Sequence, residues 1–188
     1  MPCCLERCRD VNHGGAEWYL AQWDGIGLPN AADMIYAADR LALAPGERLD
    51  VLFERLDAGD VALLTRLRAL PHFGNDCDEV DHIGARLLTM AAEALERRAT
   101  PLRRALTLGH LAGGENMHIA YGLRLGPTLD GRTAGQTLAD SLAGSQGAAR
   151  SGPAALLHSV CKLDHSRLIG GNVSTLQLGP SEFATAEG

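Results

Sequence analysis

His72-Phe73-Gly74-Asn75-Asp76-Cys77-Asp78 is the stretch that decides the fold around it. Glycine adopts positive φ angles, and asparagine side chains hydrogen-bond to nearby backbone, so this composition predicts a tight turn. An aspartate at its end can accept from the free N–H groups that open a helix. We therefore predict a turn that leads directly into the longest helix of the chain. Its apolar face is predicted to hold Val80, Ile83, Leu87, Ala91, Ala94 and Leu95.

The four carboxylates of this stretch, Asp76, Asp78, Glu79 and Asp81, look like an acid–base or metal cluster. The simpler interpretation is that negative side chains stand at the positive end of a helix dipole. We expect the structural role, entry into the helix, to be the main one.

Three further helices are predicted upstream, at about 29–42, 49–56 and 60–70. Residues 3–27 before them suggest an irregular arm or a strand with turns. Gly59 can terminate the second helix and Asp60 can cap the third. Downstream the pattern changes: Ala105–Leu108, Met117–Tyr121 and Asn172–Leu178 suggest short strands, and Pro153 opens a helix to about Leu163. A helical first half followed by mixed elements predicts an α/β fold.

Composition excludes several classes of protein. The 188 residues carry a formal net charge of -6, which argues against nucleic acid as a partner because phosphate binding needs clustered cations. The N-terminus has no apolar signal region, and no stretch approaches the roughly 20 apolar residues that cross a bilayer. We expect a cytoplasmic protein without a membrane partner. Five cysteines in such a chain suggest reduced thiols.

The segment from Asn116 to Gly122 carries the candidate pocket residues. If it is a strand, Asn116 and His118 share one face and Tyr121 lies on the other. A single histidine in a strand is more often a structural residue than a catalyst, so we name these three as pocket candidates and assign no catalytic residue.

Two polar motifs follow. Thr128-Leu129-Asp130-Gly131-Arg132 has the composition of a tight loop, in which Asp130 and Arg132 can form a charge-assisted pair. Ser159-Val160-Cys161-Lys162-Leu163-Asp164-His165 ends the predicted helix. Ser159 and Lys162 match a pattern used in acyl transfer, but we expect them to be structural late on a helix.

These motifs, with Gly14-Gly15-Ala16, resemble in order and spacing the glycyl radical enzymes, in the pyruvate formate-lyase-like branch of dehydratases and lyases. The resemblance runs from about Cys4 to about Leu178. It implies that 1–188 is one partial domain, a portion of the second half of a ten-stranded α/β barrel. The residues that it identifies as structural are Gly74, Asn75, Asp76, Asp130, Gly131, Arg132, Lys162 and Asp164.

The family's chemistry uses a thiyl cysteine and a glycine that stores the radical in an Arg-Val-x-Gly-Tyr-like loop. The 188 residues contain no such loop. Cys4-x-Glu6 resembles the thiyl motif, but it lies too close to Gly14-Gly15-Ala16. Cys3, Cys4, Cys8 and His13 are an alternative zinc set, although an adjacent cysteine pair fits zinc spacing poorly, and we predict no metal.

The resemblance thus predicts a fragment or shortened member of a glycyl radical enzyme, inactive alone and with no cofactor in this chain. The alternatives are one subunit of a split enzyme, or a non-catalytic interaction protein. In full-length relatives a radical-SAM activase installs the radical, so the implied partners are this activase and a second copy or complementary subunit. An incomplete barrel leaves strand edges that pair with other chains, which predicts aggregation or obligate association.

Overall fold

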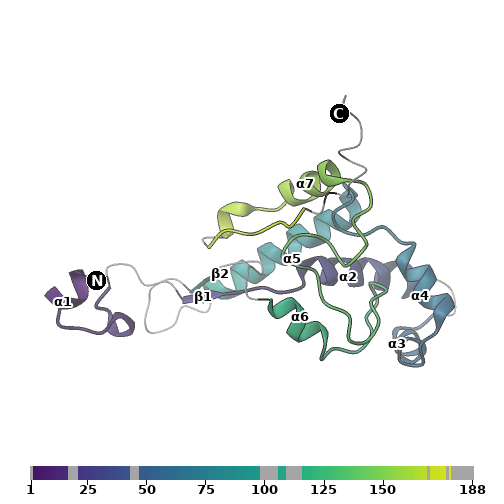
Figure 1. The fold of residues 1–188 in the computed structure, drawn as a ribbon, viewed down its shortest axis with the longest axis horizontal. Coiled ribbons are helices and arrows are strands. Elements are labelled where there is room, and N and C mark those ends of the chain that lie inside the picture. Colours follow the sequence, from purple (N-terminus) through teal and green to yellow (C-terminus); the bar gives the residue numbers. More distant parts are fainter. Residues whose placement is uncertain are drawn as a thin grey trace.

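The computed structural model describes residues 2–16, 21–42, 47–97, 106–108, 116–168, 170–176 and 178. Most of these residues are helical or lie in loops (Figure 1). The elements in chain order are α1 (Pro2–Glu6), η1 (Val11–His13), β1 (Ala21–Trp23), α2 (Leu28–Ala42), α3 (Leu49–Asp57), α4 (Val61–Arg68), α5 (Asp78–Arg97), β2 (Leu106–Leu108), α6 (Met117–Gly122), α7 (Pro153–Cys161) and η2 (His165–Arg167).

Helices α2 and α5 run alongside each other through the middle of the molecule, and α7 lies across α5 (Figure 1). Phe73, from the turn before α5, is fully buried between them. Burying an aromatic side chain of this size is among the larger apolar contributions that a core can contain. The cluster around it comprises Ala32, Tyr36, Val80, Leu88, Leu142, Leu156, Val160, Leu163 and Leu168.

A second apolar cluster joins the far end of α2 to α3 and α4. It includes Leu41, Leu52, Leu63 and Leu67, with Leu129 from the polar loop. Asp60 caps α4, since its carboxylate accepts from Leu63 N at 3.0 Å. The loop that contains Leu129 is thereby fixed against the α3–α4 end of the molecule.

The helices α2, α3, α4, α5 and α7 confirm the predicted helical segments. The predicted faces are less accurate. In α5, Ala91 and Ala94 are exposed, and the inward stripe is Val80, Asp81, Gly84, Leu88 and Ala92. The prediction is correct for Val80, Ile83, Leu87 and Leu95, which belong to the core cluster or pack against it, and wrong for Ala91 and Ala94. Helix α5 is covered by both α2 and α7, so its most buried stripe also includes polar and small residues.

The strands differ more from the prediction. Met117–Gly122 is the helix α6, so the predicted strand there is wrong. Among the described residues of 172–178, Ser174 forms an antiparallel bridge with Ser141. These residues do not form the longer strand that was predicted. Strand β2 agrees with the prediction and pairs in parallel with β1, with Gln22 opposite Thr107. The described chain is therefore richer in helix than the predicted α/β fold.

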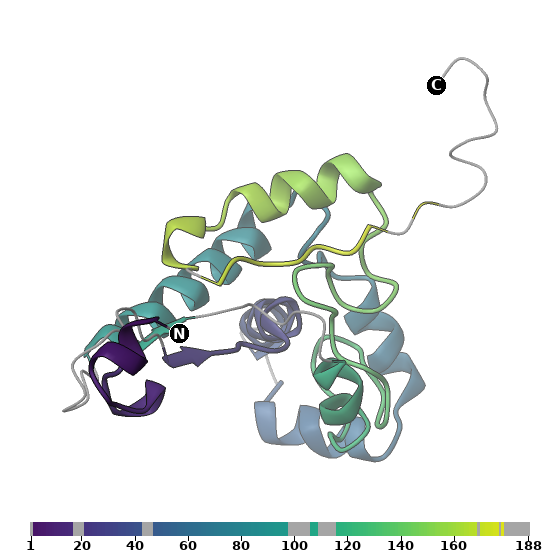
Figure 2. The ribbon, with the colours of Figure 1, turned by 60° about the vertical axis from the view of Figure 1, so that its left-hand side comes forward.

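Figure 1 shows the N-terminal arm, with α1 and η1, at one end of the molecule and apart from β1 and β2, and Figure 2 shows this end turned toward the viewer. Its Gly-Gly-Ala motif has a steric explanation, because a Cβ atom at Gly15 would lie 2.1 Å from the carbonyl oxygen of Arg9. Arg7 Nη1 donates to the carbonyl of Ala16 at 3.2 Å and closes the turn. No described helix has the length and apolarity needed to cross a lipid bilayer.

Candidate functional site

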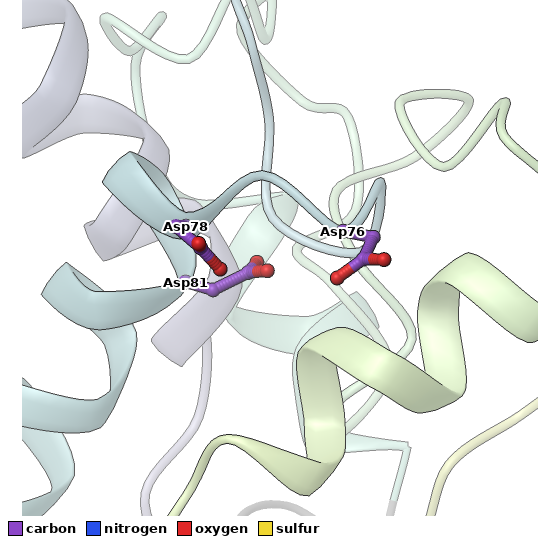
Figure 3. Close-up of side chains that lie close together, drawn as sticks. All are labelled: Asp76, Asp78 and Asp81. Carbon is purple, nitrogen blue, oxygen red and sulfur yellow. The ribbon is translucent and has the colours of Figure 1, made fainter.

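The three aspartates at the start of α5 converge on one point (Figure 3). The ammonium of Lys162, from the end of α7, occupies that point. Its Nζ lies 2.7 Å from Asp76 Oδ1, 2.6 Å from Asp78 Oδ1 and 2.9 Å from Asp81 Oδ2. A metal ion at this position would have to displace the lysine. The cluster is thus an ion-paired joint between two helices.

The charged forms of Lys162 and of the aspartates in this cluster stabilise one another. Hydrogen bonds from Lys162 lower the pKa of both Asp76 and Asp78 below its ordinary value. Burial opposes the charge of the ammonium, yet its bonds to the aspartates raise the pKa of Lys162. A lysine held in this way is a poor base or nucleophile, because both roles need the neutral amine.

Ser159 completes the joint. Its hydroxyl accepts from Asp76 N at 2.9 Å and donates to Asp81 Oδ2 at 2.9 Å. Both the side chain of Ser159 and that of Asp81 are buried. The hydroxyl donates to a carboxylate and Lys162 is charged, so the acyl-transfer pattern has no activated nucleophile.

Asn75 links the same turn to the loop before α7. Its Nδ2 donates to the carbonyls of His72 at 3.1 Å and Ala148 at 2.9 Å. Its Oδ1 accepts from the backbone N–H groups of Arg150 and Ser151, at 2.8 and 3.0 Å. One amide side chain therefore fixes two loops that lie more than 70 residues apart in the sequence.

The Arg132 side chain holds the backbone of its own loop through several hydrogen bonds. Its guanidinium donates to the carbonyls of Gln136 at 2.9 Å and Gly122 at 3.3 Å, and also to that of Gly126. The structure does not show the expected charge-assisted pair with the Asp130 carboxylate, because the Nη groups donate to carbonyl oxygens and Nε donates to Thr128 Oγ1 at 3.1 Å. Asp130 instead accepts from the backbone N–H of Arg132 at 3.3 Å.

The Asp130 carboxylate belongs to a buried polar network. It accepts from Thr128 Oγ1 at 2.5 Å and from Asn30 Nδ2 at 2.6 Å. Asn30, in the first turn of α2, also donates to Ser145 Oγ at 3.2 Å and accepts from Ala139 N at 2.7 Å. This side chain therefore connects α2 to two loops from the other half of the chain.

Asp33, one turn further along α2, continues the network. It accepts from Ser145 Oγ at 2.6 Å and from the backbone N–H of Phe73 at 2.7 Å. His72 Nδ1 lies 3.0 Å away, at ion-pair distance but without the direction of a hydrogen bond. Burial raises the pKa of the Asp33 carboxyl. Burial opposes the charge of His72, but Asp33 outweighs it and raises the pKa of the imidazole.

Of the three pocket candidates, His118 and Tyr121 lie on α6 and Asn116 directly precedes it, and the three do not come together. His118 lines a cavity of about 350 Å³, with Nδ1 3.8 Å from Asp140 Oδ1. Asp140 also accepts from Thr175 Oγ1 at 2.8 Å. Tyr121 lines a different, largely apolar groove of about 550 Å³. Asn116 is the exposed residue before α6, with a φ of 53°.

Asp164 caps η2, since its carboxylate accepts from Ser166 N at 3.1 Å. The cysteines of the alternative zinc set, like Cys77 and Cys161, form no disulfide bond within the part of the chain that the structure describes. Among the described residues, the three aspartates are the only group of histidine, cysteine or acidic side chains close enough to share a metal.

Sequence reasoning missed Asn30, Asp33 and Ser145. The available signal was the spacing of Asn30 and Asp33, three residues apart on the same side of α2 as the buried Ala37 and Leu41. Polar residues in an inward stripe indicate a buried hydrogen-bond network, because burying them without partners is costly. No comparable pattern marks Ser145, which lies in a loop.

Comparison with known proteins identifies a family with the same sequence pattern. Residues 1–120 match the model of the pyruvate formate lyase-like family. The chain is 26% identical over 189 residues to Probable dehydratase YbiW of Escherichia coli (strain K12), covering 95% of this chain and 23% of that protein. It is 25% identical over 203 residues to the trans-4-hydroxy-L-proline dehydratase of Clostridioides difficile, covering 96% and 24%.

The fold is also that of a solved relative. The glycerol-bound B12-independent glycerol dehydratase from Clostridium butyricum superposes with a TM-score of 0.86 at 26% identity, over 98% of this chain and 24% of that one. The chain thus spans about a quarter of the length of the proteins that it matches. On these grounds, the chain belongs to the pyruvate formate lyase-like family of glycyl radical enzymes.

Proposed function

We propose that this chain forms part of the barrel wall of a glycyl radical dehydratase that removes water from a small hydroxylated substrate. The observation that carries the proposal is the superposition of nearly the whole chain on one quarter of the glycerol dehydratase. The two sequence relatives described above are also named as dehydratases, which favours elimination of water over acyl transfer.

The resemblance implies a thiyl radical that takes a hydrogen atom from the carbon next to a hydroxyl-bearing carbon. That hydroxyl takes up a proton and leaves as water, and the product radical takes a hydrogen atom back from the cysteine thiol. The thiyl cysteine and the glycyl loop would come from polypeptide other than these 188 residues, in the same or a complementary chain. Activation by a radical-SAM enzyme, assembly with a second copy and a cytoplasmic location are parts of the same proposal.

Within this proposal, α6 supplies the residues nearest the substrate. The His118 imidazole and the Asp140 carboxylate face a cavity large enough for a small polyol. Such a pair can donate to and accept from substrate hydroxyls and so fix their orientation. Tyr121, on the same helix, and Asn116, directly before it, remain pocket candidates.

Two features of the surface support the proposal that this chain associates with further polypeptide. The groove at Tyr121 is lined mainly by apolar side chains: Ile26, Met117, Leu125 and Leu138. In addition, β1 and β2 form a sheet of two strands among the described residues, which is the smallest unit of a barrel wall. Apolar surface and open strand edges both favour association.

The proposal is tested on the native protein, purified anaerobically from the source cells with an antibody against this chain. We expect the antigen to be either a polypeptide about four times as long, as the relatives are, or a stable complex with a second polypeptide. Treatment with the cognate activase should give the electron paramagnetic resonance signal of a glycyl radical, and glycerol or hydroxyproline should be tested for dehydration.

A native antigen of 19.9 kDa that elutes as a monomer, with no radical signal after activation, would contradict the proposal. A stable complex that never acquires the radical would favour the interaction protein instead. The His118→Gln variant, beside an Arg86→Gln control on the exposed side of α5, then tests the cavity: we expect lower turnover only in the former.

A further inference from the structure

A second polar cavity, of about 260 Å³, shares residues 145–147 and Arg150 with the cavity at His118 but is otherwise lined by different residues. Its wall contains buried groups that are already paired, including Asn30, Asp130 and Ser145. Such a wall is preorganised, because its polar side chains are fixed by bonds to one another.

Two arginines on this wall are held in the same way. Arg68 Nε donates to the carbonyl of Gly131 at 2.9 Å, and Arg150 Nε donates to the carbonyl of Gly147 at 2.8 Å. Gly131 is required for the first contact, since a Cβ atom there would lie 2.7 Å from Arg68 Cγ. Each guanidinium is thus anchored at its inner nitrogen, and its Nη groups have no partner among the described residues.

The carboxylate that lines the cavity does not neutralise these two cations. Asp130 already accepts from Asn30, Thr128 and the backbone of Arg132. Arg132, also on the wall, is itself committed to carbonyl oxygens. Three arginines and one carboxylate line this cavity, which leaves an excess of positive charge there although the chain as a whole has a formal net charge of -6.

We propose that this cavity binds a small oxyanion, a phosphate or a carboxylate group, between Arg68 and Arg150. Paired guanidinium N–H groups match the spacing of two oxygens on such an anion, and these bonds are among the strongest in proteins. The volume accommodates a free anion or the charged end of a small metabolite. The inference does not depend on the proposed dehydratase activity, because it uses only residues of this chain.

The test is equilibrium dialysis of the purified 188-residue chain against radiolabelled inorganic phosphate, and separately against labelled acetate. Chloride keeps the ionic strength constant, so general screening does not change between samples. We expect saturable binding of one anion per chain, with the tighter of the two labels identifying the preferred group. Arg150→Gln should weaken binding at least tenfold, as the loss of a charge-assisted contact does.

Arg68→Gln should weaken binding by a similar factor, and Arg86→Gln is the matched control because that arginine is exposed and outside the cavity. Circular dichroism checks that each variant is folded. If Arg68→Gln does not fold, Arg150→Gln decides, since Arg150 is exposed and outside the core clusters. Binding that does not saturate, or that is equally tight in the Arg150 variant, would overturn the proposal.

Discussion

Lys162 is the only lysine in the sequence, among sixteen arginines. Its position explains why an ammonium is used there. Three carboxylate oxygens within 4.8 Å of one another surround a compact point charge, whereas a planar guanidinium suits one or two carboxylates side by side. This residue neutralises Asp81, which is fully buried, and so makes the junction of α5 and α7 possible.

We predict that Lys162→Met destabilises the protein by about 3 kcal/mol at neutral pH, because it leaves a buried carboxylate without its partner. Arg167→Met is the control. Arg167 pairs with the exposed Glu96, so its loss should cost under about 1 kcal/mol. Urea unfolding of the three proteins measures both values.

The difference in unfolding free energy between wild type and Lys162→Met should depend on pH. The pKa values of Asp76 and Asp78 are lowered in the folded protein, so their contribution is present above the ordinary value of 3.8 and is lost as the pH falls through the folded values. We therefore expect the difference between wild type and Lys162→Met to shrink below about pH 4. A difference that is constant from pH 7 to pH 3 would contradict the ion-pair interpretation.

For single residues, the sequence predicted the local turn correctly but did not predict which distant residues its side chains contact. Gly74 and Asn75 form the predicted turn, and Gly74 has a φ of 92°. The residues that Asn75 and Asp76 contact, Ala148 and Lys162, are more than 70 residues away. Local composition indicates that a turn exists, but distant partners depend on the packing of α7.

Among the secondary-structure elements, α6 is one whose type the sequence predicted wrongly. Met117–Tyr121 was predicted to be a strand, and so short a segment cannot distinguish period 2 from a helix. Tertiary contacts decide its conformation: Leu138 N donates to the carbonyl of His118 at 3.1 Å. By contrast α2, α4 and α5 are long enough or capped clearly enough to be predicted from local signals.

We predict that Gly122→Ala, at the end of α6, costs about 1–3 kcal/mol through overpacking. A Cβ atom there would lie 2.5 Å from the carbonyl oxygen of Gln136 and 2.6 Å from Thr137 Cα, so backbone must move. Ala120→Gly, on the exposed side of α6, is the comparison and should cost no more than about 1 kcal/mol. Thermal unfolding distinguishes them, and equal losses would mean that α6 does not pack as described.

At the scale of the whole molecule, an apolar groove of about 550 Å³ lies open beside α6. Leu125 lines it and is 45% exposed. The family's motifs in the sequence led to the expectation of open surface, but its position could not be predicted while α6 was interpreted as a strand.

We predict that the isolated chain self-associates through this groove, and that Leu125→Lys shifts it toward monomer. Leu5→Lys is the control, because Leu5 is more exposed, at 79%, but lies on the N-terminal arm. Light scattering after size-exclusion chromatography gives the masses. A wild-type chain that is monomeric at all concentrations would exclude the groove as a contact surface.

The joint between α5 and α7 has one more consequence. Lys162, Ser159 and Asn75 connect residues 75–81 to residues 148–162 through noncovalent contacts that do not depend on the polypeptide running between the two segments. A single proteolytic nick between α5 and α6 should therefore yield two bands in denaturing gels, yet one particle in native chromatography. The two halves of this chain would behave as a self-assembling pair of peptides.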